Sequence, residues 1–351
     1  MKQLIIADVK SYNENGKSTG HYFSVAQNYL DLYSEYCDVK IAGGPIFKTH
    51  FSGKDVFLLP YDFIPSKNWI KNKWRVLMNC QNLFRRTSME DIIVLQHSGA
   101  STTLLGIVLF ANKKNTIYLI QYDTDAVSSL TKWTIYKLAK KKIKGIICPN
   151  KHIAETYGLP NCVVTDYIYP NDRYKLSSDY EDKKYDIAIV GSIHPDKGVL
   201  EAAKKLANSK YKVLIAGKAD NNLADKLHKI CEKAENIELH IGFIKDEDYY
   251  RYIRSARFCM LNYHGVYSSR SSGVVLDIIF NGTPIIGHRC NALNFISEAN
   301  VGYLFDDIKN IDFAKIINKE NYKNYQIGII AYLNMQKKYR QKVVNFLHLK
   351  D

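Results

Sequence analysis

Hydrophobic and polar positions in the second half of the chain alternate between strand-like and helix-like patterns. Short apolar runs at 185–191 and 211–217 both end in glycine, which is typical of buried parallel strands. The apolar residues Val199, Ala202, Ala203 and Leu206 follow the i, i+3, i+4, i+7 spacing of one helix face. The same criteria predict further strands at 237–242, 258–263 and 283–288, and helices at 220–234, 247–256 and 273–281. Strands that alternate with helices predict an α/β fold with a parallel sheet covered on both faces.

The first half shows the same alternation less regularly. Strands, or strands that lead into helices, are predicted at 2–9, 37–44, 92–97, 116–123 and 144–150, with a helix near 21–35. Residues 65–86, which are basic and contain Trp, are predicted to be irregular. Residues 92–112 contain no Asp, Glu, Lys or Arg and are long enough to span a bilayer, but their polar centre QHSGASTT argues against burial in lipid. A buried strand, a loop and an apolar helix are expected there instead.

The length of 351 residues favours two domains. A polar segment rich in Tyr and Asp, residues 169–186, is the predicted linker between them. We expect one Rossmann-like domain at 1–168 and another at 187–320, with parallel sheets that face each other across a cleft. Residues 321–351 are predicted to form a helix that packs back on the first domain. Because open α/β sheets bind ligands outside the carboxyl ends of their strands, the chemistry should lie in the loops that follow the strands.

Composition and charge restrict the class of protein and of partner. Apolar residues make up 46% and charged residues 24%, which excludes a disordered or fibrous chain. The net charge of +14 implies an anionic partner, either nucleic acid, phospholipid headgroups or a phosphorylated substrate. The seven cysteines are an odd number and no two are closer than fourteen residues, so neither a disulfide framework nor a CxxC metal pair is indicated. Free thiols in a reducing cytoplasm are expected, and the N-terminal apolar run of four residues is too short for a signal-peptide core.

The stretch VGSIHPDKG, residues 190–198, suits a phosphate group. The chain leaves a predicted strand, turns at Gly191 and Ser192, and reaches Lys197 immediately before a predicted helix. The unpaired N–H groups and positive dipole end of a helix N-terminus attract an anion, and Lys197 adds a full charge. The alternative is an ordinary strand-to-helix turn with a solvated lysine.

A second pattern of this kind lies within residues 262–287. Ser271, Ser272 and Gly273 stand where a loop enters a helix, so that their N–H groups can surround a diphosphate, and Arg270 is adjacent. Asp277, one helical turn further on, can accept hydrogen bonds from both hydroxyls of a ribose. The neighbouring Tyr263 and Val274 are assigned to the same nucleotide site.

These stretches resemble the C-terminal domains of GT-B nucleotide-sugar glycosyltransferases, in particular family 4 and its relatives. The matching residues are Gly191, Lys197-Gly198, Gly217, Gly242 with Asp246 to Tyr250, and Gly273 to Ile286. The resemblance covers 185–305 closely and the first half only loosely. It implies a nucleotide diphosphate sugar donor, with a UDP-sugar favoured, bound by the second domain, and an acceptor bound by the first. It also places Gly217 in the donor site.

The chain departs from the family pattern at one position of the donor site. The family often has two glutamates eight positions apart; the second corresponds to Asp277, and the first falls on Ser269. The first glutamate usually contacts the donor sugar, so the departure concerns the identity of the sugar and the stereochemical outcome. In the first half, residues 16–30 resemble the glycine loop of the family, which implies that Gly20 and His21 approach the donor phosphates. The alternative there is a surface loop before an amphipathic helix.

Two strand ends in the first half supply further catalytic candidates, His97 and Asp123. The family often has a histidine at the second of these ends, where this chain has Gln121, Tyr122 and Asp123. Asp123-Thr124-Asp125 also resembles the metal-binding Asp-x-Asp of the other large glycosyltransferase fold, but that fold lacks a second α/β domain, so no metal and no cofactor are predicted. HExxH, GxSxG and P-loop motifs are absent from the sequence, which disfavours hydrolases and kinases.

Two basic stretches, 65–86 and 130–145, contain all three tryptophans. Lys and Arg interleaved with Trp, Ile and Leu suit peripheral contact with an anionic membrane. The alternative is a solvated basic face over an ordinary core. Nucleic acid is disfavoured as a partner because no nucleic-acid-binding module is recognisable.

Together these features predict a glycosyltransferase that moves a sugar from a nucleotide diphosphate sugar to a hydroxyl of a growing, lipid-linked surface glycan. It would be cytoplasmic and peripheral on the inner face of the cell membrane. Lys197 and Arg270 would oppose the charge that builds on the leaving diphosphate. The resemblance implies retention of anomeric configuration without a metal. Two alternatives stay open: a non-catalytic partner subunit of a glycosyltransferase complex, and a nucleotide-sugar epimerase of the same fold.

Overall fold

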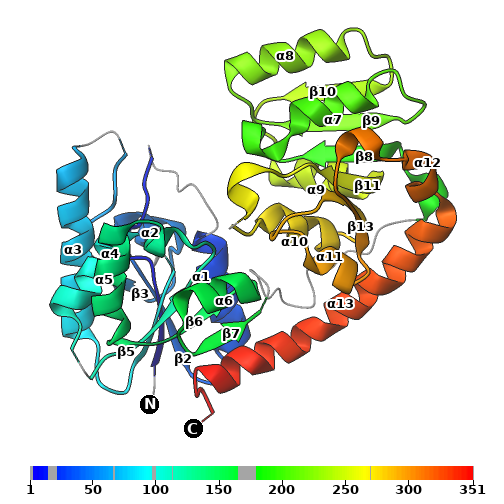
Figure 1. Ribbon diagram of the computed structural model, residues 1–351. Helices are drawn as coiled ribbons and strands as arrows, with labels where there is room; N and C mark the ends of the chain where they lie inside the picture. Colours follow the sequence, from blue (N-terminus) through cyan, green and yellow to red (C-terminus); the bar gives the residue numbers. More distant parts are fainter. Residues whose placement is uncertain are drawn as a thin grey trace. The chain divides into compact units, whose positions relative to one another are not determined.

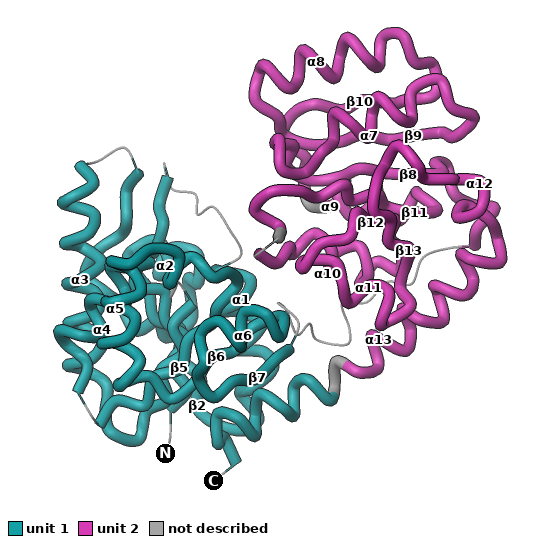
Figure 2. The backbone as a smooth tube through the Cα atoms, viewed as in Figure 1, with its two compact units in different colours: residues 1–170, 337–351 teal, residues 171–336 magenta. Residues whose placement is uncertain are grey.

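The computed structural model of the chain describes residues 3–14, 22–65, 68–96, 100–112, 114–164, 179–268 and 270–350. Two compact units make up the chain (Figure 2): Met1–Pro170 with Lys337–Asp351 form unit 1, and Asn171–Gln336 form unit 2. Of the predicted linker 169–186, the structure describes 179–186. This part belongs to unit 2 and contains a 3-10 turn, η3 (Tyr180–Asp182), and the start of a strand.

In its described residues, unit 1 contains a seven-stranded parallel sheet in the order β3-β2-β1-β4-β5-β6-β7 (Figure 1). Its strands are β1 (Gln3–Ala7), β2 (Asp38–Gly43), β3 (Val56–Leu58), β4 (Ile92–Leu95), β5 (Thr116–Ile120), β6 (Ile143–Cys148) and β7 (Asn161–Val163). Its helices include α1 (Tyr22–Tyr33), α2 (Pro45–His50), α3 (Trp69–Arg86), α4 (Ser101–Phe110), α5 (Leu130–Lys140) and α6 (Lys151–Tyr157). The strand order reverses between β1 and β4, as in doubly wound sheets.

The core of unit 1 forms because its strands are apolar on both faces. Ile5, Ile93 and Ile117 are fully buried and pack in one hydrophobic cluster with residues of α3, α4 and α5. These three helices lie side by side (Figure 1), with α4 in contact with both α3 and α5.

The prediction that residues 65–86 are irregular was wrong, because most of them form helix α3. The side chain of Asn68 accepts a hydrogen bond from the N–H of Ile70 and caps the helix. The buried residues Val76, Cys80 and Leu83 recur at helical spacing and face the core. Lys, Arg and Trp residues on the opposite face obscured this narrow apolar stripe in the sequence.

Unit 2 contains, over its described residues, a six-stranded parallel sheet in the order β10-β9-β8-β11-β12-β13. The strands are β8 (Tyr185–Val190), β9 (Val213–Gly217), β10 (Ile237–Ile241), β11 (Ala256–Leu261), β12 (Ile285–His288) and β13 (Gly302–Phe305). The helices include α7 (Val199–Leu206), α8 (Asn221–Cys231), α9 (Asp246–Arg254), α10 (Gly273–Phe280), α11 (Phe295–Glu298) and α12 (Phe313–Ile316). The prediction of an α/β fold with two parallel sheets is confirmed. The strand β13 was not predicted.

The last helix, α13 (Lys319–Phe346), contributes residues to both units, because the boundary between them falls after Gln336. In unit 1, the ring of Phe346 lies against β6, where a β-carbon on Gly145 would come within 2.5 Å of the ring. Glycine at this position therefore lets the end of α13 pack closely on the sheet. Among the described residues, no helix combines the length and the apolar character needed to cross a membrane.

Candidate functional site

The strand order of unit 2 places two loops side by side at the carboxyl edge of its sheet. β8 and β11 are hydrogen-bonded neighbours, and the order of strands reverses between them. The loop after β8 begins at Gly191, and the loop after β11 leads to Tyr263. The carboxyl ends of strands at such a switch point are the usual ligand site of a doubly wound sheet.

Lys197 is the most unusual residue of the first loop. It ends a 3-10 turn, η4 (Pro195–Lys197), and only 7% of its surface is exposed. Its Nζ donates a hydrogen bond to Oγ of Ser192, at 3.2 Å. Burial lowers the pKa of Lys197 to about 8. A cation held in a poorly solvated position attracts an incoming anion strongly.

Gly191 lies between Lys197 and α10, the helix that follows the second loop. It has a φ of 107°, which favours glycine. A β-carbon built on it would lie 3.6 Å from Nζ of Lys197 and 3.5 Å from Cγ2 of Val274. A β-carbon on Gly217, at the end of β9, would collide with the carbonyl oxygen of Gly191. The structure therefore brings Gly191, Gly217, Lys197 and Val274 together, and their role in a donor site stays a prediction.

The start of α10 faces this cluster. Ser272 is its N-cap residue and its side chain does not cap the helix. The N–H of Val275 bonds to the carbonyl oxygen of Ser272, whereas the N–H groups of Gly273 and Val274 have no intrahelical acceptor. Oγ of Ser272 instead lies 3.0 Å from the hydroxyl of Tyr263. Tyr263 is buried, which raises its pKa and keeps it a neutral phenol. The first turn of α10, at Gly273 and Val274, thus presents backbone donors and a positive dipole end beside Lys197.

Asp277 lies three residues after Val274 and therefore on the same face of α10. Its Oδ2 accepts a hydrogen bond from the hydroxyl of Tyr249, at 3.2 Å. Tyr249, from α9, is half-buried, and its pKa is raised by burial and by the Asp277 charge. Tyr249 thus holds one carboxylate oxygen in place. No local pattern in the sequence indicates this contact, because the two residues lie on different helices.

An aromatic stack beside the site was also missed by the sequence analysis. The rings of Tyr263 and Tyr267 stack at 4.1 Å between centroids, and Tyr267 in turn stacks on His194. Burial and the charge of Lys197 lower the pKa of His194, and the charge of Arg270 acts in the same direction. Arg270 is exposed, and its charge reaches His194, as the charge of Lys197 does. His194 stands inside the stretch VGSIHPDKG, so its position could have been noticed.

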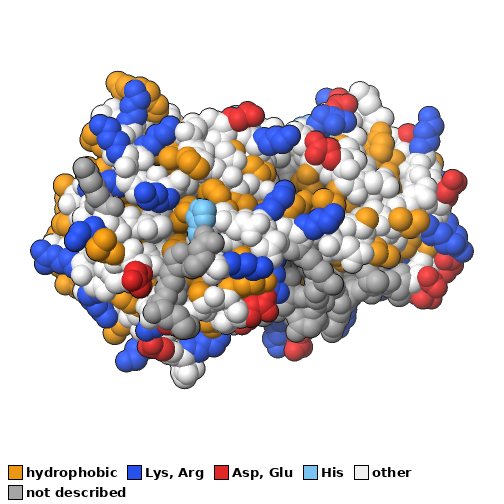
Figure 3. Space-filling view, turned by 90° about the horizontal axis from the view of Figure 1, so that it is seen from below, with side chains coloured by type: hydrophobic (Ala, Val, Ile, Leu, Met, Phe, Trp, Pro, Cys, Tyr) orange, Lys and Arg blue, Asp and Glu red, His pale blue; other side chains and the backbone are white. Residues whose placement is uncertain are grey.

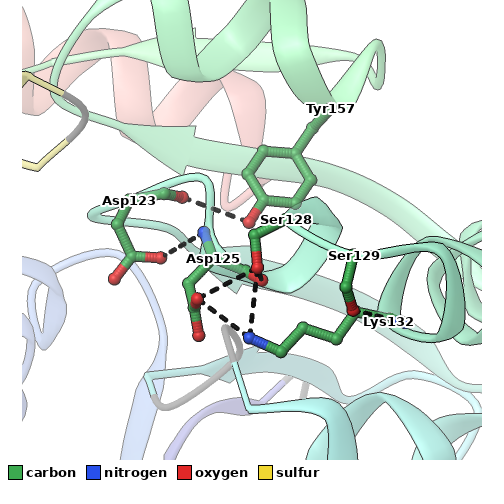
Figure 4. A network of polar contacts seen from close by, with 6 residues as sticks. All are labelled: Asp123, Asp125, Ser128, Ser129, Lys132 and Tyr157. Atoms are coloured by element: carbon green, nitrogen blue, oxygen red, sulfur yellow. Dashed lines mark hydrogen bonds and ion pairs between the residues drawn. The ribbon is translucent and has the colours of Figure 1, made fainter.

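Asp123 and Asp125, in unit 1, have local structural partners (Figure 4). Oδ1 of Asp123 accepts a hydrogen bond from the N–H of Asp125, at 2.9 Å, and starts the 3-10 turn η1 (Asp125–Val127). Oδ1 of Asp125 is paired with Nζ of Lys132, at 2.9 Å. Tyr157 donates to the carbonyl oxygen of Asp123, at 3.1 Å. The two carboxylates therefore shape the turn before α5, while a catalytic role of Asp123 stays a prediction.

Four predicted site residues, Gly20, His21, His97 and Ser269, lie outside the described residues. Ser271 is half-buried immediately before the N-cap of α10, and no role beyond its position is evident. In the part of the chain that the structure describes, no group of three or more His, Cys, Asp and Glu side chains is placed to hold a metal ion.

Solved structures with the same architecture identify the fold as GT-B-like, in agreement with the resemblance seen in the sequence. The N-terminal domain of a Candida albicans trehalose-6-phosphate phosphatase matches with a TM-score of 0.72 and 8% identity, over 100% of this chain and 97% of that one. A UDP-forming α,α-trehalose-phosphate synthase from Burkholderia xenovorans, in complex with glucose-6-phosphate, matches with a TM-score of 0.69 and 10% identity, over 99% and 100%. AviGT4, a glycosyltransferase involved in avilamycin A biosynthesis, matches with a TM-score of 0.60 and 14% identity, over 99% and 98%. No protein-family model and no curated protein matches the chain.

Proposed function

We propose that the chain is a glycosyltransferase that moves a sugar from a nucleotide diphosphate sugar to a hydroxyl of a growing, lipid-linked surface glycan. Unit 2 binds the donor and unit 1 the acceptor. The observation that carries the proposal is the placement of the buried Lys197 beside Gly191 and the first turn of α10. A full positive charge and unpaired N–H groups at one point are suited to a diphosphate.

Stabilisation of the leaving group is the main catalytic effect in this proposal. As the bond between the anomeric carbon and the diphosphate oxygen breaks, negative charge builds on the diphosphate. Lys197, Arg270 and the N–H groups of the first turn of α10 oppose that charge. The acceptor oxygen bonds to the anomeric carbon from the same side, and its proton passes to the departing phosphate oxygen. The sugar keeps its anomeric configuration, and no metal and no protein base are needed.

The donor is proposed to be a UDP-sugar. Support comes from the fold alone, because the matching synthase is described as UDP-forming and another matching structure is described as bound with UDP-2-fluoro glucose. In this chain we assign the ribose contact to Asp277, whose Oδ2 accepts a hydrogen bond from Tyr249 and whose carboxylate can accept further ones from the ribose hydroxyls.

The acceptor is proposed to be lipid-linked because one helix layer of unit 1 suits an anionic membrane. α3, α4 and α5 contain no Asp or Glu, whereas α3 has five basic residues and α5 has three. Trp69 is 63% exposed and Leu130 is 79% exposed, each near the start of its helix. Helices that connect parallel strands start at the carboxyl edge of the sheet, so both residues lie toward the edge where a ligand is expected. The enzyme would then be cytoplasmic and peripheral on the inner face of the cell membrane.

The decisive experiment follows release of free nucleoside diphosphate from a panel of nucleotide sugars, with and without an extract of lipid-linked acceptors. We expect acceptor-dependent release with at least one UDP-sugar, unaffected by a chelator of divalent cations. Absence of turnover with every donor would contradict the proposal and favour the partner-subunit alternative. Conversion of the donor sugar without any acceptor would favour the epimerase alternative.

A further inference from the structure

A pocket of about 650 Å³ opens at the amino ends of three strands of unit 1. Ile92 and Thr116 are the first residues of β4 and β5, and Lys144 is the second residue of β6. Leu347 and His348, which follow α13, complete the wall together with Met89, Glu90 and Tyr118. The acceptor is proposed to bind at the carboxyl ends of the strands, which form the opposite edge of the sheet. The pocket is therefore separate from that site.

The floor of the pocket is apolar and its rim is charged. Ile92, Tyr118 and Leu347 are all nearly or fully buried and form the floor. Lys144 and His348 are exposed at the rim. The face drawn in Figure 3 shows hydrophobic atoms exposed between Lys and Arg side chains, which are more widespread there than Asp and Glu. A volume of this size, with an apolar floor and few polar groups, is typical of small-molecule sites.

The backbone of His348 provides a second, independent observation. After α13, the N–H of Leu349 bonds to the carbonyl of Val344 and the N–H of His348 to that of Asn345. This pair of bonds is the Schellman motif, in which His348 occupies the position that glycine usually takes. His348 has the left-handed φ of 53° that strains any residue with a β-carbon. The Schellman motif therefore fixes the backbone of His348 at the end of α13, and the side chain of His348 lines the pocket.

From these observations we propose that the pocket binds a small organic anion with an apolar or aromatic body. Lys144 and His348 hold the anionic group, and Tyr118, Ile92 and Leu347 enclose the apolar body. Glu90, also at the rim, accepts a hydrogen bond from a hydroxyl or amino group of the ligand. Helix α13 has residues in both units, and Leu347 and His348 follow directly after it. A ligand in the pocket therefore also contacts the end of this helix.

Phenyl phosphate is the probe for this site, since it joins an aromatic ring to a phosphate. Titrations of the full chain, followed by NMR shifts or calorimetry, are compared with inorganic phosphate and with phenol. We expect phenyl phosphate to bind at least about tenfold more tightly than either fragment, because only it uses both the floor and the rim. Equal binding of inorganic phosphate, or no binding of phenyl phosphate, would overturn the proposal.

Three variants separate the ligand site from a structural role of the same residues. Lys144→Met and His348→Gly should each weaken phenyl phosphate binding by about tenfold, the loss of one charge-assisted contact. His348→Gly should keep or raise the melting temperature, because glycine relieves the strain at this position. Lys233→Met, an exposed lysine of unit 2, is the control and should leave binding unchanged. Binding unaffected in both pocket variants would show that the probe lies elsewhere. The proposal does not depend on the transferase activity: Lys197→Met should weaken UDP binding in unit 2 by about 100-fold and leave phenyl phosphate binding in this pocket intact.

Discussion

Nζ of Lys197 lies 3.2 Å from Oγ of Ser192, and among the described residues no carboxylate forms an ion pair with this buried ammonium group. The pKa of Lys197 falls from 10.5 to about 8 because the charged form is poorly solvated. A shift of this size corresponds to roughly 3 kcal/mol of destabilisation of the folded state at neutral pH. A residue that lowers stability at a strand-end turn is more consistent with ligand binding than with a structural role.

Replacement of Lys197 should separate stability from function. Lys197→Met keeps the length of the side chain and removes the buried charge, so the melting temperature should rise. The affinity for UDP and the rate of donor turnover should fall by about 100-fold, comparable to the loss of one oxyanion-hole donor. Calorimetry measures the affinity and thermal unfolding measures the stability.

The control for this change is Lys204→Met, which removes an exposed lysine of α7. It should leave both the affinity and the melting temperature nearly unchanged, because surface substitutions have small effects. If Lys197→Met binds UDP as tightly as the wild type, Lys197 does not belong to the donor site.

The affinity for UDP should depend on pH in the alkaline range. Near pH 7 Lys197 is mostly protonated and opposes the diphosphate charge, and the affinity should begin to fall as the pH approaches 8, where half of the free protein has lost this proton. Above pH 8 the free protein loses this proton, and the affinity should fall by up to roughly tenfold per pH unit. Lys197→Met should show no such fall, and a wild-type affinity that stays constant to pH 10 would contradict the assignment.

The same pKa shift predicts how stability depends on pH. In the unfolded chain Lys197 keeps its proton up to its ordinary pKa of 10.5, whereas the folded protein releases it near pH 8. The unfolded state therefore binds more protons between pH 8 and 10.5, and this residue makes the free energy of unfolding rise with pH over that window. Denaturant unfolding of wild type and Lys197→Met, compared at pH 7, 8, 9 and 10, isolates the contribution. An equal pH dependence in the two proteins would show that Lys197 is not the group responsible.

Asp277→Asn tests the proposed contact with ribose. Removal of the charge weakens hydrogen bonds from the ribose hydroxyls, so the affinity for UDP should fall by about tenfold. The affinity for 2′,3′-dideoxy-UDP, which lacks both hydroxyls, should be nearly equal in wild type and variant. Calorimetric titration with both nucleotides gives the four affinities.

Tyr249→Phe provides the matched second variant, because it removes the hydroxyl that donates to Asp277 and keeps the ring. If Tyr249 only positions Asp277, Tyr249→Phe should lower the affinity for UDP less than Asp277→Asn does. The affinity for the dideoxy analogue should again stay unchanged. If Asp277→Asn weakens both nucleotides equally, the carboxylate acts on the diphosphate or on the fold, and the ribose assignment is wrong.

Local patterns in the sequence were enough to predict the fold class, whereas the donor site of unit 2 stays a prediction. Gly191, Lys197 and Val274 were selected because a strand end followed by a helix start is visible within a few residues, and the structure places them side by side. The contact from Tyr249 to Asp277 joins residues 28 positions apart on two helices, and no local period encodes such a pair. Helix α3 was missed because Trp and Lys on its exposed face mask its apolar stripe. Asp123 and Asp125 look like a metal motif in sequence, and the ion pair of Asp125 with Lys132, the third residue of α5, could not be predicted from that motif.

The helix layer of unit 1 should bind vesicles that contain anionic lipid and should not bind neutral ones. Two exposed cations stand over Trp rings: Nζ of Lys73 lies 4.2 Å from the ring centroid of Trp69, and Nζ of Lys137 lies 3.5 Å from that of Trp133. Each basic residue near an anionic surface contributes about 1 kcal/mol, so the double change Lys73→Ala, Lys137→Ala should weaken binding by roughly 30-fold at low salt. Vesicle co-sedimentation at increasing salt measures the effect, which should shrink as the charges are screened.

The apolar part of this surface needs its own variant, because charge alone also attracts soluble polyanions. Trp69→Ala with Ile70→Ala removes two side chains that are 63% and 60% exposed, so the fold should be little affected while vesicle binding falls even at high salt. Phe243→Ala, which removes an 86% exposed ring from unit 2, is the matched control and should not change vesicle binding. Lys142 is left intact, since its Nζ donates to the carbonyl oxygens of Val108 and Ala111 and its loss would disturb α4. If the Trp69–Ile70 variant binds vesicles as well as the wild type, the helix layer is a plain solvated surface and the acceptor need not be attached to a lipid.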